Sequence, residues 1–574
     1  MKQVARTTMA GSSCALQSLR ILVFCALAAA ATTIAPRAMS PCAYSMSRTI
    51  LAVTGLDPYF ITCAGDASLS DDGADDASKK AGSGGPIVTD LRWCGKPDPL
   101  KHPAPPFQCC QPMTTSEPVN FTFPDPAEPL RTRRPAHEAG SEHMAKYRRA
   151  VALMKALPRS DPRSFYQQAN VHCAYCSGAY RQAGHPELPL QIHFTWLFFP
   201  FHRAYLYFFE RIAAKLLGDP GFALPFWSWD VPEGMRIPDE FADPASPLYN
   251  ARRNPRHLPP KVNDLEFLDA ESNYTDEQQI QRNLWVMHKQ MITNARLPSL
   301  FLGQPYHAGD SAMPGAGTVE LCPHNTMHLW AGDISNPNVE DMGVYYSAGR
   351  DPIFYPHHAN IDRLWDAWRH IMRTTNGNQT KVDFTDPDWL DSSLLFYDED
   401  ARLVRVAVRD MLDVGKLRYT YDGVGLPWLN ARPPTSPGVN SKRNHLKSVA
   451  FPVSLDVAVT VEVTRPQPPR SRQEEVLVVE GIEANNADYV KFDVYVNAME
   501  YHKVRPGGRE LAGTFVTLKQ PGGERDTMKT SMRVALSELL EDLGAGRDNN
   551  IAVTLVPVRG KVRIGGLRIE YVAE

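Results

Sequence analysis

The spacing of hydrophobic residues along the chain changes once, between residues 431 and 448. Before this point, several stretches have the composition and spacing of helices that bury one face. We predict helices at His143–Ala156, Pro200–Leu217, Asp276–Thr293, His324–Trp330 and Phe354–Arg373. Proline-rich loops separate these stretches, so this part of the chain should be mainly α-helical with long irregular connections.

After residue 448, hydrophobic residues recur at every second position. Leu455, Val457, Val459, Val461 and Val463 alternate with more polar residues, which is typical of a half-buried β-strand. Further strands are predicted at Val490–Val496, Gly513–Leu518, Ile551–Val556 and Leu567–Val572. We therefore predict an all-β, sandwich-like C-terminal domain, and an α+β fold class for the whole chain.

Composition indicates the boundaries of these parts. Residues 1–65 contain several Lys and Arg but a single acid, Asp57, and their apolar run Ile21–Ala31 is short for a membrane span. We interpret residues 1–85 as a targeting presequence with an acidic, glycine-rich linker, and expect no membrane span in the mature protein. Residues 86–431 should form the helical domain, 432–447 a linker and 448–574 the β domain.

Six of the histidines form two groups of three, and aromatic residues surround both groups. The first group is His172, His193 and His202, and the second is His324, His328 and His358. Neutral imidazole suits copper, zinc and iron, whereas magnesium and calcium prefer oxygen ligands. Two such groups in one domain predict two metal ions side by side. The net charge of −3 gives no indication of nucleic-acid binding.

The local sequence predicts how the first group is assembled. His193 and His202 are nine residues apart, so on one continuous helix they would point to opposite faces. Proline is tolerated in the first turn of a helix and disrupts its interior. We therefore start the helix near Pro200, with His202 in its first turn and His193 on the approaching segment. His172 comes from a separate segment.

The second group combines a helical pair with a distant third residue. His324 and His328 are four residues apart, so they share one helical face and can bind one ion. His357 and His358 are adjacent on a predicted helix and diverge by about 100°, so only one of them faces the metal. Asp362, one turn later, either supports this helix or orients a neighbouring side chain from a second shell.

Both histidine segments resemble the copper signatures of tyrosinases and catechol oxidases, in which two coupled copper ions form a type 3 centre. From about Cys94 to its C-terminus, the chain resembles plant polyphenol oxidase. Four ordered motifs carry the resemblance: LPFWSWDVPEGM (Leu224–Met235), MGVYYSAGRDPIFY (Met342–Tyr355), DWL (Asp388–Leu390) and KFDV (Lys491–Val494). The resemblance implies that the first histidine group holds one copper ion and the second group the other, with His357 as a second-shell neighbour.

The resemblance also implies roles for residues around the metals. Glu320 and Asn325 match positions that hold a water able to accept a proton from a phenol, whose pKa lies near 10. Leu329 would face the substrate entrance. Tyr345 occupies the place where plant enzymes usually carry a phenylalanine gate over the second copper ion, and this departure affects the expected substrate preference.

Six cysteines follow the predicted presequence, and the resemblance assigns five of them. It implies disulfide bonds Cys94–Cys110 and Cys109–Cys173, which require an oxidising compartment. It further implies a thioether bond between Cys176 and His193. This bond would fix an imidazole that our spacing argument places on a loop. Cys322, the sixth, is interpreted as a small buried hydrophobic residue.

The implied activity is the O2-dependent oxidation of o-diphenols, and possible hydroxylation of monophenols, to o-quinones. In the family, the C-terminal domain keeps the enzyme latent until it is removed. Two other functions are considered: an oxygen carrier of the haemocyanin type and a dinuclear zinc hydrolase. Zinc has no redox chemistry, and zinc hydrolase sites usually include carboxylate ligands, which neither histidine group offers. The natural phenol and the oligomeric state stay open.

Two destinations fit the presequence. Many plant polyphenol oxidases have a bipartite transit peptide that leads to the thylakoid lumen, but no twin-arginine pair precedes the apolar run here. A secretory signal, leading towards the vacuole, would not explain the Ser- and Thr-rich, acid-poor stretch that continues to about Ala64. We favour the thylakoid lumen.

Overall fold

The structure, a computed structural model, describes residues 84–96, 108–267, 272–375, 382–439, 449–469, 473–485, 488–519 and 527–573. The apolar run Ile21–Ala31 and nearly all of the predicted presequence lie outside the described residues, as do residues 440–447 of the predicted linker. Within the part that the structure describes, no helix has both the length and the hydropathy needed to cross a membrane.

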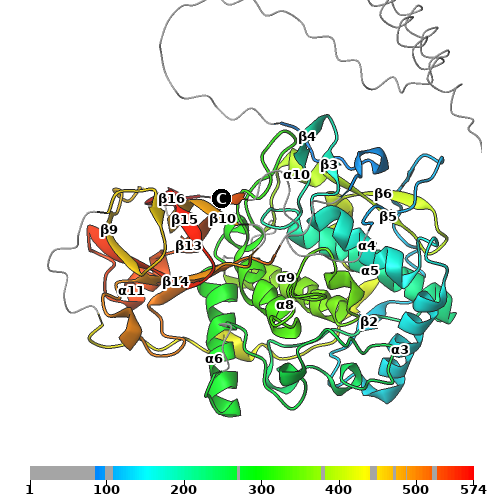
Figure 1. Ribbon diagram of the computed structural model, residues 1–574, viewed down its shortest axis with the longest axis horizontal. Coiled ribbons are helices and arrows are strands. Elements are labelled where there is room, and N and C mark those ends of the chain that lie inside the picture. Colours follow the sequence, from blue (N-terminus) through cyan, green and yellow to red (C-terminus); the bar gives the residue numbers. More distant parts are fainter. Residues whose placement is uncertain are drawn as a thin grey trace, which may run out of the picture. The chain divides into compact units, whose positions relative to one another are not determined.

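Helices dominate the first part of the described chain and surround its core (Figure 1). They are α3 (Gly140–Ala156), α4 (Phe165–Cys176), α5 (Phe198–Leu217), α6 (Asp276–His288), α7 (Pro298–Phe301), α8 (Asn325–Ala331), α9 (Phe354–Thr375) and α10 (Pro387–Asp391). All five predicted helices are present, and their ends either coincide with the prediction or are shifted by up to three residues. The last turn of the predicted third helix is a π-helical turn at Lys289–Thr293, continuous with α6.

Two of the helices differ from the prediction in informative ways. Sequence analysis missed α4 because ten of its twelve residues are buried, so that no polar face marks the helical period. Helix α5 begins at Phe198, two residues before the predicted start. Pro200 still lies in the first turn, where its missing N–H leaves no hydrogen bond unmade, and His202 moves to the second turn.

Short strands pair between the helices. They are β1 (Val119–Asn120), β2 (Arg131–Arg133), β3 (Arg181–Gln182), β4 (His185–Pro189), β5 (Ser393–Tyr397), β6 (Leu403–Ala407) and β7 (Tyr419–Tyr421). Strands β1, β6 and β5 form a small sheet, and β2 pairs with β7. The long helices α3 and α9 both pack against α5 and enclose the hydrophobic core of this part.

The C-terminal part is a sandwich of two sheets, coloured yellow to red in Figure 1. Its elements are β8 (Val453–Ser454), β9 (Val459–Thr464), β10 (Glu474–Asn485), β11 (Lys491–Val496), β12 (Leu511–Val516), β13 (Thr527–Ala535), β14 (Asn550–Arg559), β15 (Val562–Ile564), β16 (Gly566–Val572) and helix α11 (Ser537–Asp542). One sheet has the order β13-β10-β15-β8, with β16 also paired to β10, and the other has the order β12-β11-β14-β9.

The period-two pattern located four strands of the sandwich and misplaced the start of another. The predicted alternation began at Leu455, but β9 begins at Val459, and Val457 is 70% exposed in the bend before it. Strands β10 and β13 were missed. Strand β10 lies between β13 and β16 and buries five consecutive residues, of which the last four, Val476–Val479, form a continuous apolar run rather than an alternation.

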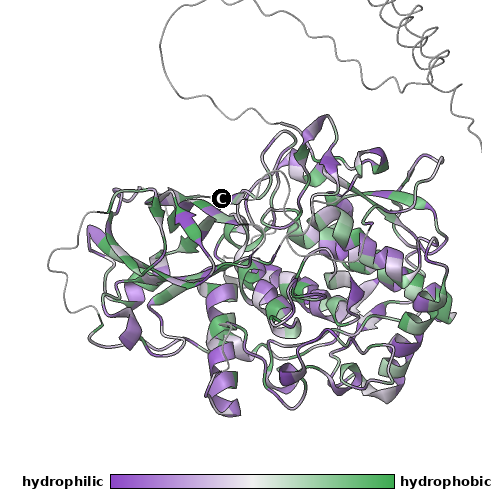
Figure 2. Ribbon diagram, in the orientation of Figure 1, coloured by the Kyte–Doolittle hydropathy of each residue, from purple (hydrophilic) through white to green (hydrophobic). Residues whose placement is uncertain are grey.

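The helical and β parts share their cores. Val516 and Leu518, from the end of β12 and just after it, lie in the hydrophobic core of the helical part. In return, Phe194 and Leu321 of the helical part lie in the core of the sandwich. The ammonium of Lys491, the first residue of the KFDV motif, is buried and donates to the carbonyl oxygens of Glu266 and Phe267. In Figure 2 one end of α6 is hydrophilic, whereas hydrophobic residues mark the helices and strands that enclose these cores.

Asp362 is buried where α9 meets α5 and β7. Arg133 and Arg203 donate to its carboxylate, as do the hydroxyls of Tyr419 (2.7 Å) and Tyr421 (2.6 Å). Burial alone would raise the pKa of Asp362, but the two guanidinium groups outweigh it and lower that pKa. None of these hydrogen bonds of the carboxylate comes from a histidine. Asp362 therefore supports α9 by tying it to α5 and to β7.

Candidate metal centre

The three histidines of the first group meet in the core of the helical part. The ring centroids of His172 and His193 are 5.4 Å apart, those of His172 and His202 are 5.7 Å apart, and those of His193 and His202 are 5.5 Å apart. All three side chains are at most 1% exposed. His172 projects from α4 and His202 from α5, while His193 lies on the segment before α5, as the proline argument predicted.

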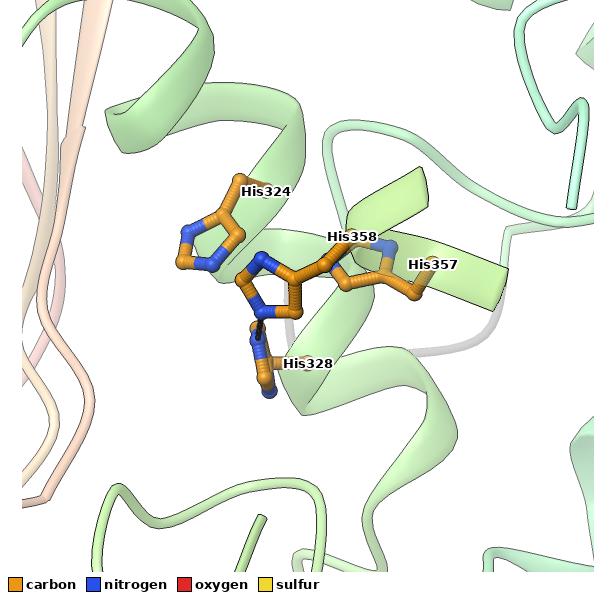
Figure 3. Close-up of side chains that lie close together, drawn as sticks. All are labelled: His324, His328, His357 and His358. Atoms are coloured by element: carbon orange, nitrogen blue, oxygen red, sulfur yellow. Dashed lines mark hydrogen bonds between the residues drawn. The ribbon is translucent and has the colours of Figure 1, made fainter. Parts of the chain in front are cut away.

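The three histidines of the second group form a similar cluster from two helices (Figure 3). The centroid of His324 lies 4.6 Å from that of His328 and 5.0 Å from that of His358. The Nε2 atoms of His328 and His358 are 3.4 Å apart. His324 is the last residue of the π-helical turn Glu320–His324, and α8 continues directly from it with His328.

The two groups lie against each other. The ring of His202 stacks on that of His358, with centroids 4.0 Å apart and an interplanar angle of 11°. The rings of His193 and His324 also face each other, at 5.7 Å. Six imidazoles therefore converge from four separate stretches of the chain, as a pair of adjacent metal ions would require.

Backbone carbonyl groups fix the tautomer of several of these rings. The Nδ1–H of His172 donates to Tyr345 O (2.8 Å), that of His202 to Phe198 O (2.8 Å) and that of His328 to Met342 O (2.7 Å). Because a carbonyl oxygen can only accept, the proton must be on Nδ1, and Nε2 keeps a free lone pair. The buried Nε2 atoms of His172, His202 and His324 indeed have no hydrogen-bond partner. The donor set fits metal ions that prefer neutral nitrogen.

His193 differs because both of its ring nitrogens are buried without a hydrogen-bond partner. The sulfur of Cys176, one turn after His172 on α4, is grouped with ring nitrogens of His172 and His193, all within 4.8 Å of one another. Both other predicted uses of cysteine around α4 are present: disulfide bonds join Cys94 to Cys110 and Cys109 to Cys173. Cys322 is buried and reduced, and its thiol contacts Leu265 O.

His357 lies next to the second group but is oriented by a different partner. The indole N–H of Trp229 donates to Nδ1 of His357 at 3.1 Å, which occupies that lone pair and puts the proton of the neutral ring on Nε2. A ring in this tautomer has no lone pair left for a metal. Sequence analysis did not identify Trp229 as a residue of the site, because a tryptophan within an apolar run is equally well explained by core packing.

Burial keeps the cluster neutral. It lowers the pKa of His172 to about 3, with a further contribution from His328, and it lowers the pKa of His328 to about 4. The pKa values of His193, His202, His324 and His358 are lowered as well, again because burial disfavours the charged ring. Neutral imidazoles are the form that binds metal ions.

Tyr345 contacts histidines of the first group. Its ring stacks on His193 of the first group, with centroids 4.1 Å apart, and its other histidine contact is His172, at 6.2 Å. The ring of Tyr345 therefore lies beside the first histidine group and not beside the second. The backbone explains the placement, because Tyr345 O accepts the hydrogen bond from His172 and so fixes the residue beside the first group.

Glu320 is the first residue of the π-helical turn that carries His324, and Asn325 directly follows that turn. Glu320 is fully buried; its Oε1 accepts the N–H of Phe194 at 2.7 Å, and its Oε2 has no hydrogen-bond partner. Burial raises the pKa of Glu320. The Oδ1 of Asn325 lies 3.0 Å from Nδ1 of His324, and its Nδ2 donates to Val516 O. Leu329, on α8, is 2% exposed.

Comparison with known protein families agrees with this geometry. Residues 162–371 match the family described as the common central domain of tyrosinase, and residues 383–434 match the polyphenol oxidase middle domain. Residues 451–571 match the chloroplastic polyphenol oxidase C-terminal domain. The chloroplastic polyphenol oxidase of Malus domestica is 47% identical over 505 residues, which cover 84% of each chain.

The chain belongs to the plant polyphenol oxidase family. The chloroplastic polyphenol oxidase of Vitis vinifera is 46% identical and covers 87% of this chain and 84% of the relative. Among solved structures, latent apple tyrosinase has a TM-score of 0.75 and 48% identity, and covers 80% of this chain and 100% of its own. A latent aurone synthase has a TM-score of 0.78 and 38% identity, over 85% of this chain and 99% of its own.

Family membership confirms the predicted chemistry. As a polyphenol oxidase, the protein is a copper enzyme with a dinuclear centre that uses O2 to oxidise small phenolic substrates, o-diphenols in particular. The α+β fold class and the type 3 copper cofactor are likewise confirmed. The oxygen carrier and the zinc hydrolase are not favoured.

The lowered histidine pKa values predict that the copper-free protein is labile to acid. The unfolded chain binds protons at its histidines near pH 6.5, but folded His172 and His328 bind them only near pH 3 and 4. Stability therefore falls as the pH drops below 6.5, by up to about 1.4 kcal/mol per pH unit for each such histidine. Thermal unfolding of the apoprotein between pH 7 and 4 measures this loss.

The control for this prediction is a His172→Leu variant, which lacks one of the titrating groups. Its unfolding temperature should depend less steeply on pH than that of the wild-type apoprotein. An unfolding temperature of the wild-type apoprotein that is constant between pH 6.5 and 4.5 would contradict the prediction.

Proposed function

We propose that the two histidine groups are the copper ligands of this polyphenol oxidase. His172, His193 and His202 hold one copper ion, and His324, His328 and His358 hold the other. The observation that carries the proposal is the convergence of six buried, neutral imidazoles, several with an unpartnered Nε2. Copper supplies a redox couple, Cu(I) and Cu(II), through which O2 oxidises a bound phenol to an o-quinone.

The adjacent residues His357 and His358 offer a matched test of this assignment. His358→Gln should leave about one copper ion per chain, because it removes a ligand, and should abolish O2 uptake with dopamine. His357→Gln should keep both copper ions at saturating copper, since Trp229 already occupies the Nδ1 lone pair of His357. Copper content by elemental analysis and O2 consumption are the measurements. Equal copper loss in the two variants would contradict the assignment.

Glu320 and Asn325 are proposed to hold the water that takes the proton of the phenol. A phenol must lose its proton near neutral pH although its pKa is near 10, so a nearby acceptor is needed. The Oε2 of Glu320 has no hydrogen-bond partner and can therefore bind a water, and it lies on the side of the site where Phe194 follows His193. Leu329 and Tyr345 are proposed to line the substrate entrance. Comparing O2 uptake by Glu320→Gln on tyramine and on dopamine tests the water, because loss of the acceptor should affect the monophenol more.

A thioether bond is proposed between Cys176 and His193. A C–S bond would replace the S–H bond of the thiol and one C–H bond of the imidazole, and O2, the oxidant that the enzyme already uses, would take up the two electrons and two protons. The support is geometric: the buried sulfur lies close to a ring whose nitrogens have no hydrogen-bond partner, so no hydrogen bond fixes that ring. The bond would hold the one histidine of the first group that is not on a helix. Peptide mass analysis after reduction and alkylation tests it: the joined peptides should be lighter by two hydrogens, and an alkylated Cys176 would refute the bond.

We propose that residues 448–574 form a shielding domain over the catalytic domain, residues 86–431, and keep the enzyme latent. Val516 O accepts from the Asn325 amide, and Val344 pairs with Lys519. Leu518 is also buried. Burial raises the pKa of Tyr345, and hydrogen bonds with the Asn325 side chain and the Leu518 backbone oppose this rise in part. While Val516 O accepts one N–H of the Asn325 amide, that N–H is not available to a water. Relatives named as latent forms are consistent with this proposal.

Cleavage in the linker therefore should activate the enzyme. If the open state of the intact chain is populated at about 10% or less, release of the β domain raises kcat/KM for dopamine by about tenfold or more. The measurement uses a protease site inserted in the linker, with the same site inserted but not cleaved as the control. Cleavage that separates the domains without any rise in kcat/KM would rule out shielding as the cause of latency.

For its location we propose the plastid, and within it the thylakoid lumen. Relatives with the same domains are named chloroplastic, and two disulfide bonds fit an oxidising compartment. The presequence on which the finer assignment rests lies outside the described residues. Import into isolated chloroplasts tests this location. After import, the envelope is lysed, the thylakoids are kept intact and protease is added. Digestion of the imported protein would exclude the lumen.

A further inference from the structure

A second group of metal-ligating side chains lies outside the histidine core. Nε2 of His307, on the loop after α7, is 3.7 Å from Oδ2 of Asp386 and 3.9 Å from Oδ2 of Asp388. One ligand atom from each of the three residues lies within 4.8 Å of the others. The three side chains are 20–39% exposed, so the group is open to ions in solution.

A fourth carboxylate orients the imidazole of this group. Oδ2 of Asp310 accepts the backbone N–H of His307 at 2.8 Å and lies 3.3 Å from its ring Nδ1. This contact favours the tautomer with the proton on Nδ1 and leaves the Nε2 lone pair facing Asp386 and Asp388. A carboxylate behind the imidazole is the usual outer partner of a metal-binding histidine, where it fixes the ring and raises its basicity.

The two aspartates are also held in place. Oδ1 of Asp386 caps α10 by accepting the N–H groups of Asp388 and Trp389, so that Oδ2 is left to face His307. The ring of His307 packs on Trp196, with centroids 4.9 Å apart. Among the described residues, Asp310, Asp386 and Asp388 form no ion pair with Lys or Arg, and each has a carboxylate oxygen 3.3–3.9 Å from a ring nitrogen of His307. The group therefore carries an excess of negative charge.

We propose that His307, Asp386 and Asp388 bind one divalent transition-metal ion, such as Zn2+, in addition to the copper pair. One imidazole with two carboxylates suits zinc better than magnesium or calcium, which prefer a full set of oxygen ligands. Ligand distances of about 2.0–2.1 Å require the two N···O separations to contract by a few tenths of an ångström. Water completes the coordination on the exposed side.

The proposed ion would join two loops that both hold the segment after His193. The indole of Trp389 donates to Trp196 O at 3.0 Å. Trp196 N donates to Gln304 O, and its indole donates to Tyr306 O, at 3.0 and 3.1 Å. An ion bound between His307 and α10 therefore stabilises both anchors of Trp196, three residues beyond a proposed copper ligand. The proposed ion would thus give Asp388, the aspartate of the DWL motif, a structural role.

The experiment uses the full, copper-loaded chain, with Zn2+ as the probe. Protein equilibrated with Zn2+ is separated by gel filtration, and zinc and copper are counted by elemental analysis. We expect one zinc per wild-type chain without loss of copper, and no zinc in His307→Gln or Asp388→Asn. The unfolding temperature should rise with Zn2+ in the wild type and not in these variants. Asp310→Asn should weaken zinc binding by about 10- to 100-fold.

Asp391→Asn is the matched control, because it removes one carboxylate from the same helix at a position paired with Arg409 instead of His307. It should bind zinc like the wild type. No zinc in the wild type, or equal zinc uptake by wild type, His307→Gln and Asp388→Asn, would overturn the proposal. Unchanged copper content in the variants shows that the loss of zinc is local.

Discussion

The structure depends on keeping six imidazoles neutral and correctly turned in a core that water does not reach. An unpartnered nitrogen in such a core is costly unless it has a ligand. Backbone carbonyl groups reduce this cost, because they accept hydrogen bonds from the Nδ1–H of His172, His202 and His328. Nε2 then keeps its lone pair for a metal. The hydrogen bonds that stabilise the fold therefore also determine which ring nitrogen can bind a metal.

Much of the helical scaffold follows from local rules. Pro200 predicts a helix start between His193 and His202, and the four-residue spacing of His324 and His328 predicts that both can bind one ion. The hidden helix α4 shows the limit of such rules: a helix buried on almost every side has no polar face, so its period cannot be read from the sequence. The central strand β10 was missed for the corresponding reason, because both of its faces are covered.

The features that the sequence could not specify concern relations between distant segments. No local pattern indicates that Tyr345 O binds His172, and this contact is what places the tyrosine ring on the first group. The role of Asp362 likewise depends on Arg133, Arg203 and two tyrosines that lie far away in the sequence. Trp229 is a third example, because its indole selects the tautomer of His357 across 128 positions of the chain. Family resemblance supplied the ligand set, but the hydrogen bonds that orient it required coordinates.

The exchange of side chains between the two cores has a consequence for the processed enzyme. Phe194 and Leu321 are covered by the sandwich, and Val516 and Leu518 fill space in the helical part. Removal of the sandwich would therefore expose a hydrophobic surface beside the histidine groups, at the segment that follows His193. Aromatic substrates can bind to this hydrophobic surface, and two processed molecules can associate through it. Removal of the sandwich would thus give substrates access to the site and lower the solubility of the enzyme.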